Sequence, residues 1–189
     1  MELGLTFPLQ RFLKMKPPLY GTEPDRRFCW DVHNIRLRGR ECLLAVHCHS
    51  RYAFVRWDVS PLQWGDITGL FREGLADSLH GAGFSPETVT GYLQQAGAIG
   101  LTRTHGRREV AFLNRAWEDV LALDLCLDTS RQAQPLLDQA VNTDTVRQIA
   151  EHKMIGPAFA GSGRQHLPQP MRRSRGIGPA LGADGRDTI

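Results

Sequence analysis

The sequence lacks the features by which several classes of protein are recognised. Its 189 residues contain no run of about eighteen or more apolar residues, so no membrane-spanning helix is expected. The segment from Met1 to Pro8 has neither the basic start nor the apolar centre of a signal peptide, which predicts an intracellular, cytoplasmic protein. The four cysteines form no Cys-x-x-Cys pair, so neither a zinc ribbon nor a thioredoxin-like redox site is expected.

Motifs of nucleophilic catalysis and phosphate binding are also missing. There is no Gly-x-Ser-x-Gly elbow, and Cys48 is expected to project to the opposite strand face from its neighbours His47 and His49. The glycine-rich segments 156–163 and 176–182 lack the Lys-Ser/Thr ending and the strand–loop–helix context of a phosphate loop. The sequence therefore predicts neither a catalytic thiol nor a cofactor.

What is present fits one ordinary globular domain followed by a different kind of segment. Apolar residues make up 41% of the chain and charged residues 23%, which is enough for a real core. Residues 156–189 are rich in Gly, Pro and Arg and cannot bury enough surface to offset the entropy of ordering. We therefore expect an α+β domain over residues 1–125, a helical extension over 126–155 and a disordered tail over 156–189.

The stretch from Phe28 to Trp57 contains three strand-like runs separated by short polar breaks, which predicts an antiparallel meander. Further strands are expected at Leu3–Leu5, on a sheet edge, and at Ala98–Thr104. Apolar residues at helical spacing predict helices near 61–80, 86–96 and 107–123. The predicted fold is α+β, with a sheet of three to five antiparallel strands covered on one face by about three helices.

The turn at Arg38-Gly39 decides which side chains of the first two strands meet. A two-residue loop suits glycine in second place, where positive φ is needed, and it sets Trp30 opposite His47 and Cys29 opposite Cys48. A three-residue loop would instead set Asp31 opposite His47. We favour the two-residue loop, in which imidazole packs on aromatic rings.

The other register gives the alternative functional hypothesis. His47 and His49 share one strand face, and with Asp31 beside them they would form a three-ligand metal site for a hydrolase or nuclease. In the favoured register Asp31 points to the opposite face, which leaves only two ligands. The favoured register thus predicts no metal site there.

Arginines are concentrated in the meander, where residues 26–56 carry seven arginines against Asp31 and Glu41. Basic side chains interleaved with aromatic residues are typical of surfaces that bind nucleic acid, although scattered solvated arginines give the same pattern. The leading hypothesis is a non-catalytic binding or regulatory protein that engages nucleic acid or a protein through this hairpin or through the C-terminal extension. The candidate binding residues are Arg36, Arg38, Arg40, Arg51, Tyr52, Arg103, Arg107 and Arg108.

Several short patterns occur in a recognisable order along the first two thirds of the chain. They are Met1-x-Leu-Gly-Leu-Thr, the Ser50-Arg-Tyr-x-Phe-Val run, and Leu113-Asn-Arg-Ala116. Together they resemble a small bacterial domain family without an assigned function, over roughly residues 1–125. The resemblance implies a compact α+β domain and no known activity or cofactor.

Overall fold

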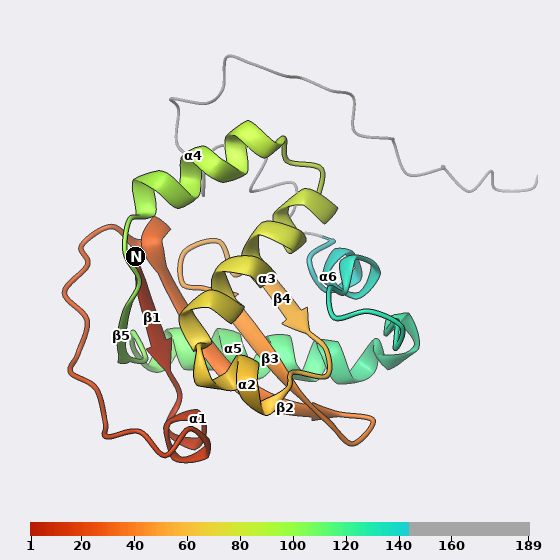
Figure 1. Cartoon of the computed structure of the whole chain (residues 1–189), viewed down its shortest axis with the longest axis horizontal. Helices are drawn as coiled ribbons and strands as arrows, with labels where there is room; N and C mark the ends of the chain where they lie inside the picture. The colour runs from red at the N-terminus through yellow and green to blue at the C-terminus, as the bar shows by residue number, and fades with distance from the viewer. Residues whose placement is uncertain (144–189) are drawn as a thin grey trace, which may run out of the picture.

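The computed structural model describes residues 1–143, which form one five-stranded sheet surrounded by helices (Figure 1). The strands are β1 (Glu2–Leu5), β2 (Cys29–Leu37), β3 (Arg40–His47), β4 (Ala53–Arg56) and β5 (Gly100–Arg103). The helices are α1 (Phe7–Phe12), α2 (Pro61–Gly65), α3 (Ile67–Gly81), α4 (Pro86–Ala96), α5 (Arg107–Ala122) and α6 (Pro135–Val141), with short 3-10 turns at Arg26–Phe28 and Asp124–Cys126. The predicted tail, 156–189, and the end of the predicted extension lie outside the described residues.

The predicted α+β class and the helices near 86–96 and 107–123 are confirmed, but the range 61–80 is divided at Asp66 into α2 and α3, and the sheet is mixed. Strands β2, β3 and β4 form the predicted antiparallel meander, and the sheet order is β4-β3-β2-β1-β5. Strand β1 is not at the edge as predicted, because it lies between β2 and β5 and runs parallel to both. A parallel neighbour requires a long crossover, and α1 with the connector that follows it supplies one between β1 and β2.

The hairpin between β2 and β3 has the favoured register. Trp30 pairs with His47 and Asp31 with Val46. Arg38 and Gly39 both have positive φ, 43° and 80°, as a type I′ two-residue turn requires. The alternative register, with Asp31 opposite His47, is therefore wrong.

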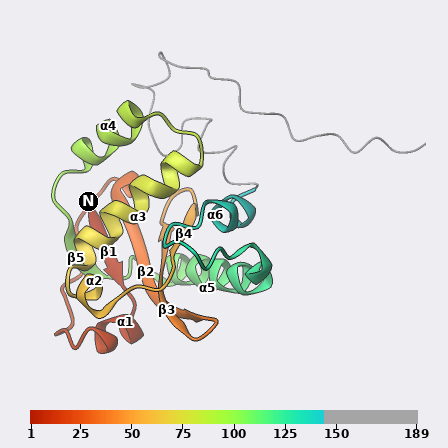
Figure 2. The ribbon, with the colours of Figure 1, turned by 45° about the vertical axis from the view of Figure 1, so that its right-hand side comes forward.

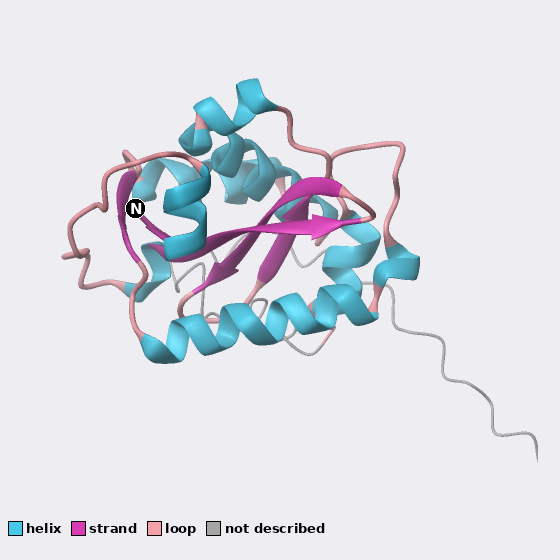
Figure 3. Cartoon of the chain, turned by 90° about the horizontal axis from the view of Figure 1, so that it is seen from below, coloured by secondary structure: helices cyan, strands magenta, loops and turns pink. Residues whose placement is uncertain are grey.

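Helices cover both faces of the sheet rather than the one face predicted (Figures 2 and 3). The run from Cys42 to Val46 is buried at every position, so β3 presents apolar side chains to both sides. Leu43 and Ala45 join the cluster beneath α3 and α4, whereas Leu44 and Val46 join the cluster beneath α5 and α6. Within residues 1–143, no helix is both long and apolar enough to cross a membrane.

Strand β4 is at one end of the sheet, and helix α6 packs along its free edge. Side chains of α6 and its C-cap make the hydrogen bonds to the β4 backbone that a neighbouring strand would otherwise make. The backbone N–H of Val55 donates to Asp138 Oδ1 at 2.9 Å, and that of Ala53 donates to Asn142 Oδ1 at 2.8 Å. Asn142 Nδ2 also donates to the Ala53 carbonyl at 2.6 Å. An edge strand with unpaired backbone groups can pair with another chain. Helix α6, which lies in the predicted extension, occupies these groups in β4 and so protects the edge from such pairing.

Asp138 makes the stability of this edge depend on pH. Burial raises the pKa of Asp138 to about 7, from 3.8 in the unfolded chain, although hydrogen bonds from Ser78 and Val55 oppose the rise. The folded state therefore binds the proton more tightly, so stability falls as the pH rises from about 4 through about 7. A shift of this size corresponds to on the order of 4 kcal/mol.

We expect Asp138→Asn to flatten this fall, because asparagine keeps the acceptor for Val55 and does not ionise. Urea unfolding at about pH 5 and about pH 8 measures the difference. Asp58→Asn is the control, since it makes the same substitution at a side chain that is 49% exposed, and the fall in stability assigned to Asp138 should remain in it. An unaltered slope in Asp138→Asn would contradict the assignment.

Candidate functional site

The three arginines at the tip of the β2–β3 hairpin are each paired with a carboxylate. Arg36 contacts Glu41 at 2.7 Å, Arg38 contacts Asp124 at 3.0 Å, and Arg40 contacts Asp58 at 3.7 Å. The acidic partners come from β3, from the turn after α5 and from the loop after β4, respectively. The hairpin tip therefore carries little net positive charge, despite its sequence.

Two other predicted residues, Tyr52 and Arg103, have partners of their own elsewhere in the structure. The Tyr52 side chain belongs to the core, being 1% exposed, and its hydroxyl donates to the Ser78 carbonyl at 3.1 Å. It cannot stack on a ligand at the surface, so its inclusion in a binding face is corrected. Arg103 lies at the β5 edge, where its guanidinium stacks 4.9 Å from the ring of the exposed Tyr20.

The structure brings the remaining predicted arginines to the amino end of α5. The guanidinium carbon of Arg51 lies 4.2 Å from the centroid of the Phe112 ring, and that of Arg108 lies 5.7 Å from the same centroid. Arg107 is the first residue of α5 and is exposed. Within residues 1–143, neither Arg51 nor Arg107 has a carboxylate at ion-pair distance, whereas Arg108 pairs with Glu109 at 3.0 Å. We call Arg51, Arg107, Arg108 and Phe112 the Phe112 patch.

The histidines of the alternative metal hypothesis do not meet Asp31. His47 is fully buried with its ring 4.8 Å from that of Trp30, and its nitrogens contact Ser50 Oγ at 2.8 Å and the Arg27 carbonyl at 3.1 Å. Burial lowers the pKa of His47 to about 3, so it is a neutral core residue. His49 is exposed. The set Asp31, His47 and His49 is thus not a site.

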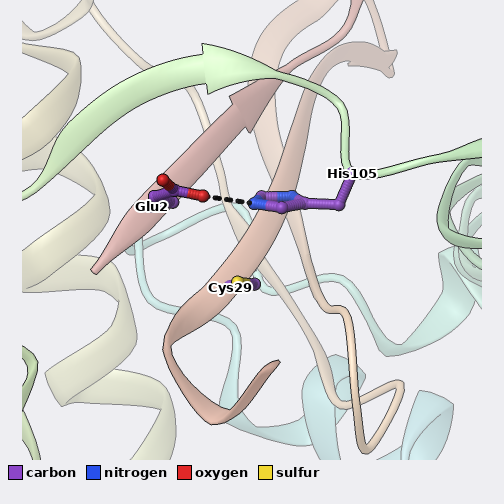
Figure 4. Close-up of side chains that lie close together, drawn as sticks. All are labelled: Glu2, Cys29 and His105. Carbon is purple, nitrogen blue, oxygen red and sulfur yellow. Dashed lines mark hydrogen bonds and ion pairs between the residues drawn. The ribbon is translucent and has the colours of Figure 1, made fainter. Parts of the chain in front are cut away.

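Asp31 instead meets His105, which follows β5 and precedes α5. His105 Nδ1 lies 2.6 Å from Asp31 Oδ1. His105 Nε2 lies 3.3 Å from Glu2 Oε2, the contact drawn as a dashed line in Figure 4. The three side chains are nearly closed to solvent, with exposures of 5% for His105, 1% for Asp31 and 14% for Glu2. One imidazole therefore bridges two carboxylates between β1, β2 and the β5–α5 turn.

The two thiols beside this imidazole are Cys29 and Cys48, which face each other as the hairpin register predicts. The Cys48 N–H donates to the Cys29 carbonyl at 3.0 Å, and Cys48 Sγ lies 3.5 Å from His105 Nδ1. Figure 4 shows Cys29 approaching His105 from the strand next to Glu2. We call Glu2, Cys29, Asp31, Cys48 and His105 the His105 cluster.

The charges in the cluster follow from burial and hydrogen bonding. Burial alone lowers the pKa of His105, but hydrogen bonds with Asp31 and the thiols outweigh it and raise that pKa. Burial also raises the pKa of Asp31, so a proton stays between these two groups at neutral pH. Burial would raise the pKa of Glu2 as well, but the N–H groups of Thr22 and Glu23 outweigh it, and the pKa is lowered. Burial raises the pKa of Cys48 to about 11, so its thiol keeps its proton.

Sequence reasoning missed His105, which lies in a short turn and shares no motif with Asp31, 74 residues earlier. In the structure, Gly4 of the Met1-x-Leu-Gly-Leu-Thr pattern lies against this pair. A Cβ at Gly4 would lie 2.1 Å from Asp31 Oδ1 and 2.9 Å from His105 Nδ1, so the pair requires glycine there. The parallel pairing of β1 with β2 and β5 is what assembles the cluster, and the sequence did not reveal that pairing.

Comparison with known families agrees with the resemblance found in the sequence. The model of a family described as a domain of unknown function (DUF6933) matches residues 2–158. That range contains every described strand and helix. No curated protein and no solved structure matches the chain.

Proposed function

The chain belongs to the DUF6933 domain family, and from its geometry we propose that the protein is a non-catalytic binding protein that engages single-stranded nucleic acid through the Phe112 patch. The observation that carries the proposal is the convergence of Arg51 and Arg108 on one face of α5, against the same ring. Arg107 adds a third cation at the start of that helix.

Stacking on Phe112 prepares these arginines to bind. A guanidinium held against a ring loses less side-chain entropy when it binds, and its edge still offers N–H donors to a phosphate. Its outer face can stack on a nucleotide base, and such stacking does not depend on the base sequence. The patch therefore suits the backbone and bases of an unpaired strand.

A comparison with the hairpin tip explains why the Phe112 patch is the proposed binding surface. Arg36, Arg38 and Arg40 each have a carboxylate beside them, so an approaching phosphate would meet a negative charge as well as a positive one. Arg51 and Arg107 have no such partner within residues 1–143. The binding face expected at the hairpin is thus proposed for the amino end of α5 instead.

Fluorescence anisotropy with a labelled single-stranded oligonucleotide, at low and at moderate salt, tests this function. We expect Arg51→Ala and Arg107→Ala each to weaken binding on the order of tenfold, about 1.4 kcal/mol, and to reduce the salt slope by about one. Arg36→Ala is the matched control, since this side chain is 72% exposed and paired with Glu41, and it should leave affinity nearly unchanged.

Two results would overturn the proposal. One is an absence of binding by the wild-type protein at both salt concentrations, which would leave a protein partner as the occupant of the patch. The other is an equal loss of affinity in Arg36→Ala and Arg51→Ala, which would mean that the positive charges act without regard to position.

A further inference from the structure

The His105 cluster contains the side chains that zinc prefers. Two groups of three potential ligands, Glu2–Cys29–His105 and Asp31–Cys48–His105, each have ligand atoms within 4.8 Å of one another. Thiolate, imidazole and carboxylate are the usual donors to Zn²⁺, whereas the hard cations Mg²⁺ and Ca²⁺ take oxygen ligands. Buried clusters of this composition therefore point to a soft or borderline metal ion.

We propose that Asp31, Cys48 and His105 form a structural zinc site in which Glu2 holds the imidazole from outside. The shortest contacts favour this group, since Asp31 Oδ1 and Cys48 Sγ lie 2.6 Å and 3.5 Å from the same nitrogen, His105 Nδ1. Zinc bound at Nδ1 leaves Nε2–H free to donate to Glu2. A metal-bound histidine typically has a carboxylate or carbonyl as its outer partner.

In the other group, Glu2–Cys29–His105, Glu2 and Cys29 already contact backbone groups of the protein. Glu2 Oε1 accepts from the N–H groups of Thr22 at 2.6 Å and Glu23 at 3.0 Å, which leaves Oε2 for His105. The Cys29 thiol lies 3.7 Å from the Asp25 carbonyl and 3.9 Å from the Glu23 carbonyl. Glu2 is therefore an orienting residue, whereas the Cys29 contacts are long, and Cys29 would fill the fourth position of a tetrahedral ion.

The location predicts a structural rather than a catalytic role. The Asp31 side chain is 1% exposed and the His105 side chain 5%, so substrate has no access to the ion. Closed zinc sites stabilise folds, whereas catalytic sites keep an open position. The proposed ligands come from β2, the β3–β4 loop and the β5–α5 turn, so one ion would join three segments that are far apart in sequence.

Binding to Asp31, Cys48 and His105 requires the loss of two protons. Cys48 must give up its thiol proton to become a thiolate ligand, and the proton between Asp31 and His105 must leave to free Oδ1 and Nδ1. The incoming Zn²⁺ replaces these two positive charges, so the net charge at these three residues is unchanged.

Metal analysis of the full chain tests the proposal. The protein is purified without chelators from zinc-supplemented cells, and we expect about one zinc ion per chain by elemental mass spectrometry. Refolding in Co²⁺ should then give the absorption of a thiolate–cobalt bond. Cys48→Ser should lose both signals, and His105→Gln should lose the bound zinc.

Matched controls separate loss of a ligand from loss of the fold. Cys126→Ser changes a half-buried thiol and His80→Gln an exposed imidazole outside the His105 cluster, and both should keep zinc at the wild-type level. Circular dichroism of each variant, refolded with and without zinc, reports whether the fold is retained. A wild-type protein without zinc and without the cobalt–thiolate band would overturn the proposal. Zinc that persists in both Cys48→Ser and His105→Gln would also overturn it.

Discussion

Replacing Trp30 by alanine is expected to lower the free energy of unfolding by about 3–5 kcal/mol. The Trp30 side chain is completely buried, and its ring packs 5.8 Å from that of Phe54 and 5.5 Å from that of Phe71, centroid to centroid. Its indole N–H also donates to the Tyr92 hydroxyl at 3.1 Å. Truncation would leave a cavity between the sheet and α3 and remove this hydrogen bond.

Urea unfolding followed by circular dichroism measures the loss. Trp117→Ala is the matched control, because Trp117 is 37% exposed and its ring partner is His33, 5.6 Å away at the sheet surface. We expect it to cost about 1 kcal/mol or less. An equal loss of unfolding free energy in the two variants would contradict the burial of Trp30 in the hydrophobic cluster beneath α3 and α4.

Substituting valine for Gly4 is expected to cost about 3–5 kcal/mol, because it forces apart a buried and hydrogen-bonded charge pair. The first carbon of any side chain at Gly4 would lie 2.1 Å from Asp31 Oδ1 and 3.0 Å from the Thr104 Cα atom. Asp31 has no room to retreat, since it is 1% exposed, and the Thr104 contact is with backbone. Strand β1 or the β5–α5 turn must therefore shift.

Gly100→Val tests whether the effect belongs to this position. Gly100 lies on the neighbouring strand β5, and a Cβ there would meet no atom within 4 Å. We expect a change within about 0.5 kcal/mol. If the Gly4→Val protein does not fold, the smaller substitution Gly4→Ala takes its place in the comparison. A Gly4→Ala protein that is as stable as Gly100→Val would contradict the close contacts assigned to Gly4.

Local sequence signals were sufficient for the elements and for the hairpin register. Ser60 and Ser85 each cap a helix that has proline at its first position, which places the starts predicted near 61 and 86, and Gly39 marked the two-residue turn. These features depend on residues within a few positions of one another. The sequence therefore predicted where most helices and strands begin and end, and which residues of β2 pair with which residues of β3.

Long-range pairing was not predictable in the same way. Strand β1 has only four residues, and nothing in its composition distinguishes an edge strand from an inner one. The His105 cluster depends on that pairing, because Glu2 reaches His105 only when β1 lies between β2 and β5. The carboxylates that neutralise the hairpin arginines include Asp124, which is 86 residues from Arg38.

The central functional claim is that the Phe112 patch, and not the hairpin tip, binds single-stranded nucleic acid. Backbone amide NMR of the full chain, titrated with an oligonucleotide, tests this claim most directly. We predict shifts concentrated at Arg51 and from Arg107 to Phe112, with little change from Arg36 to Arg40. Shifts confined to the hairpin, or none at saturating oligonucleotide, would contradict it.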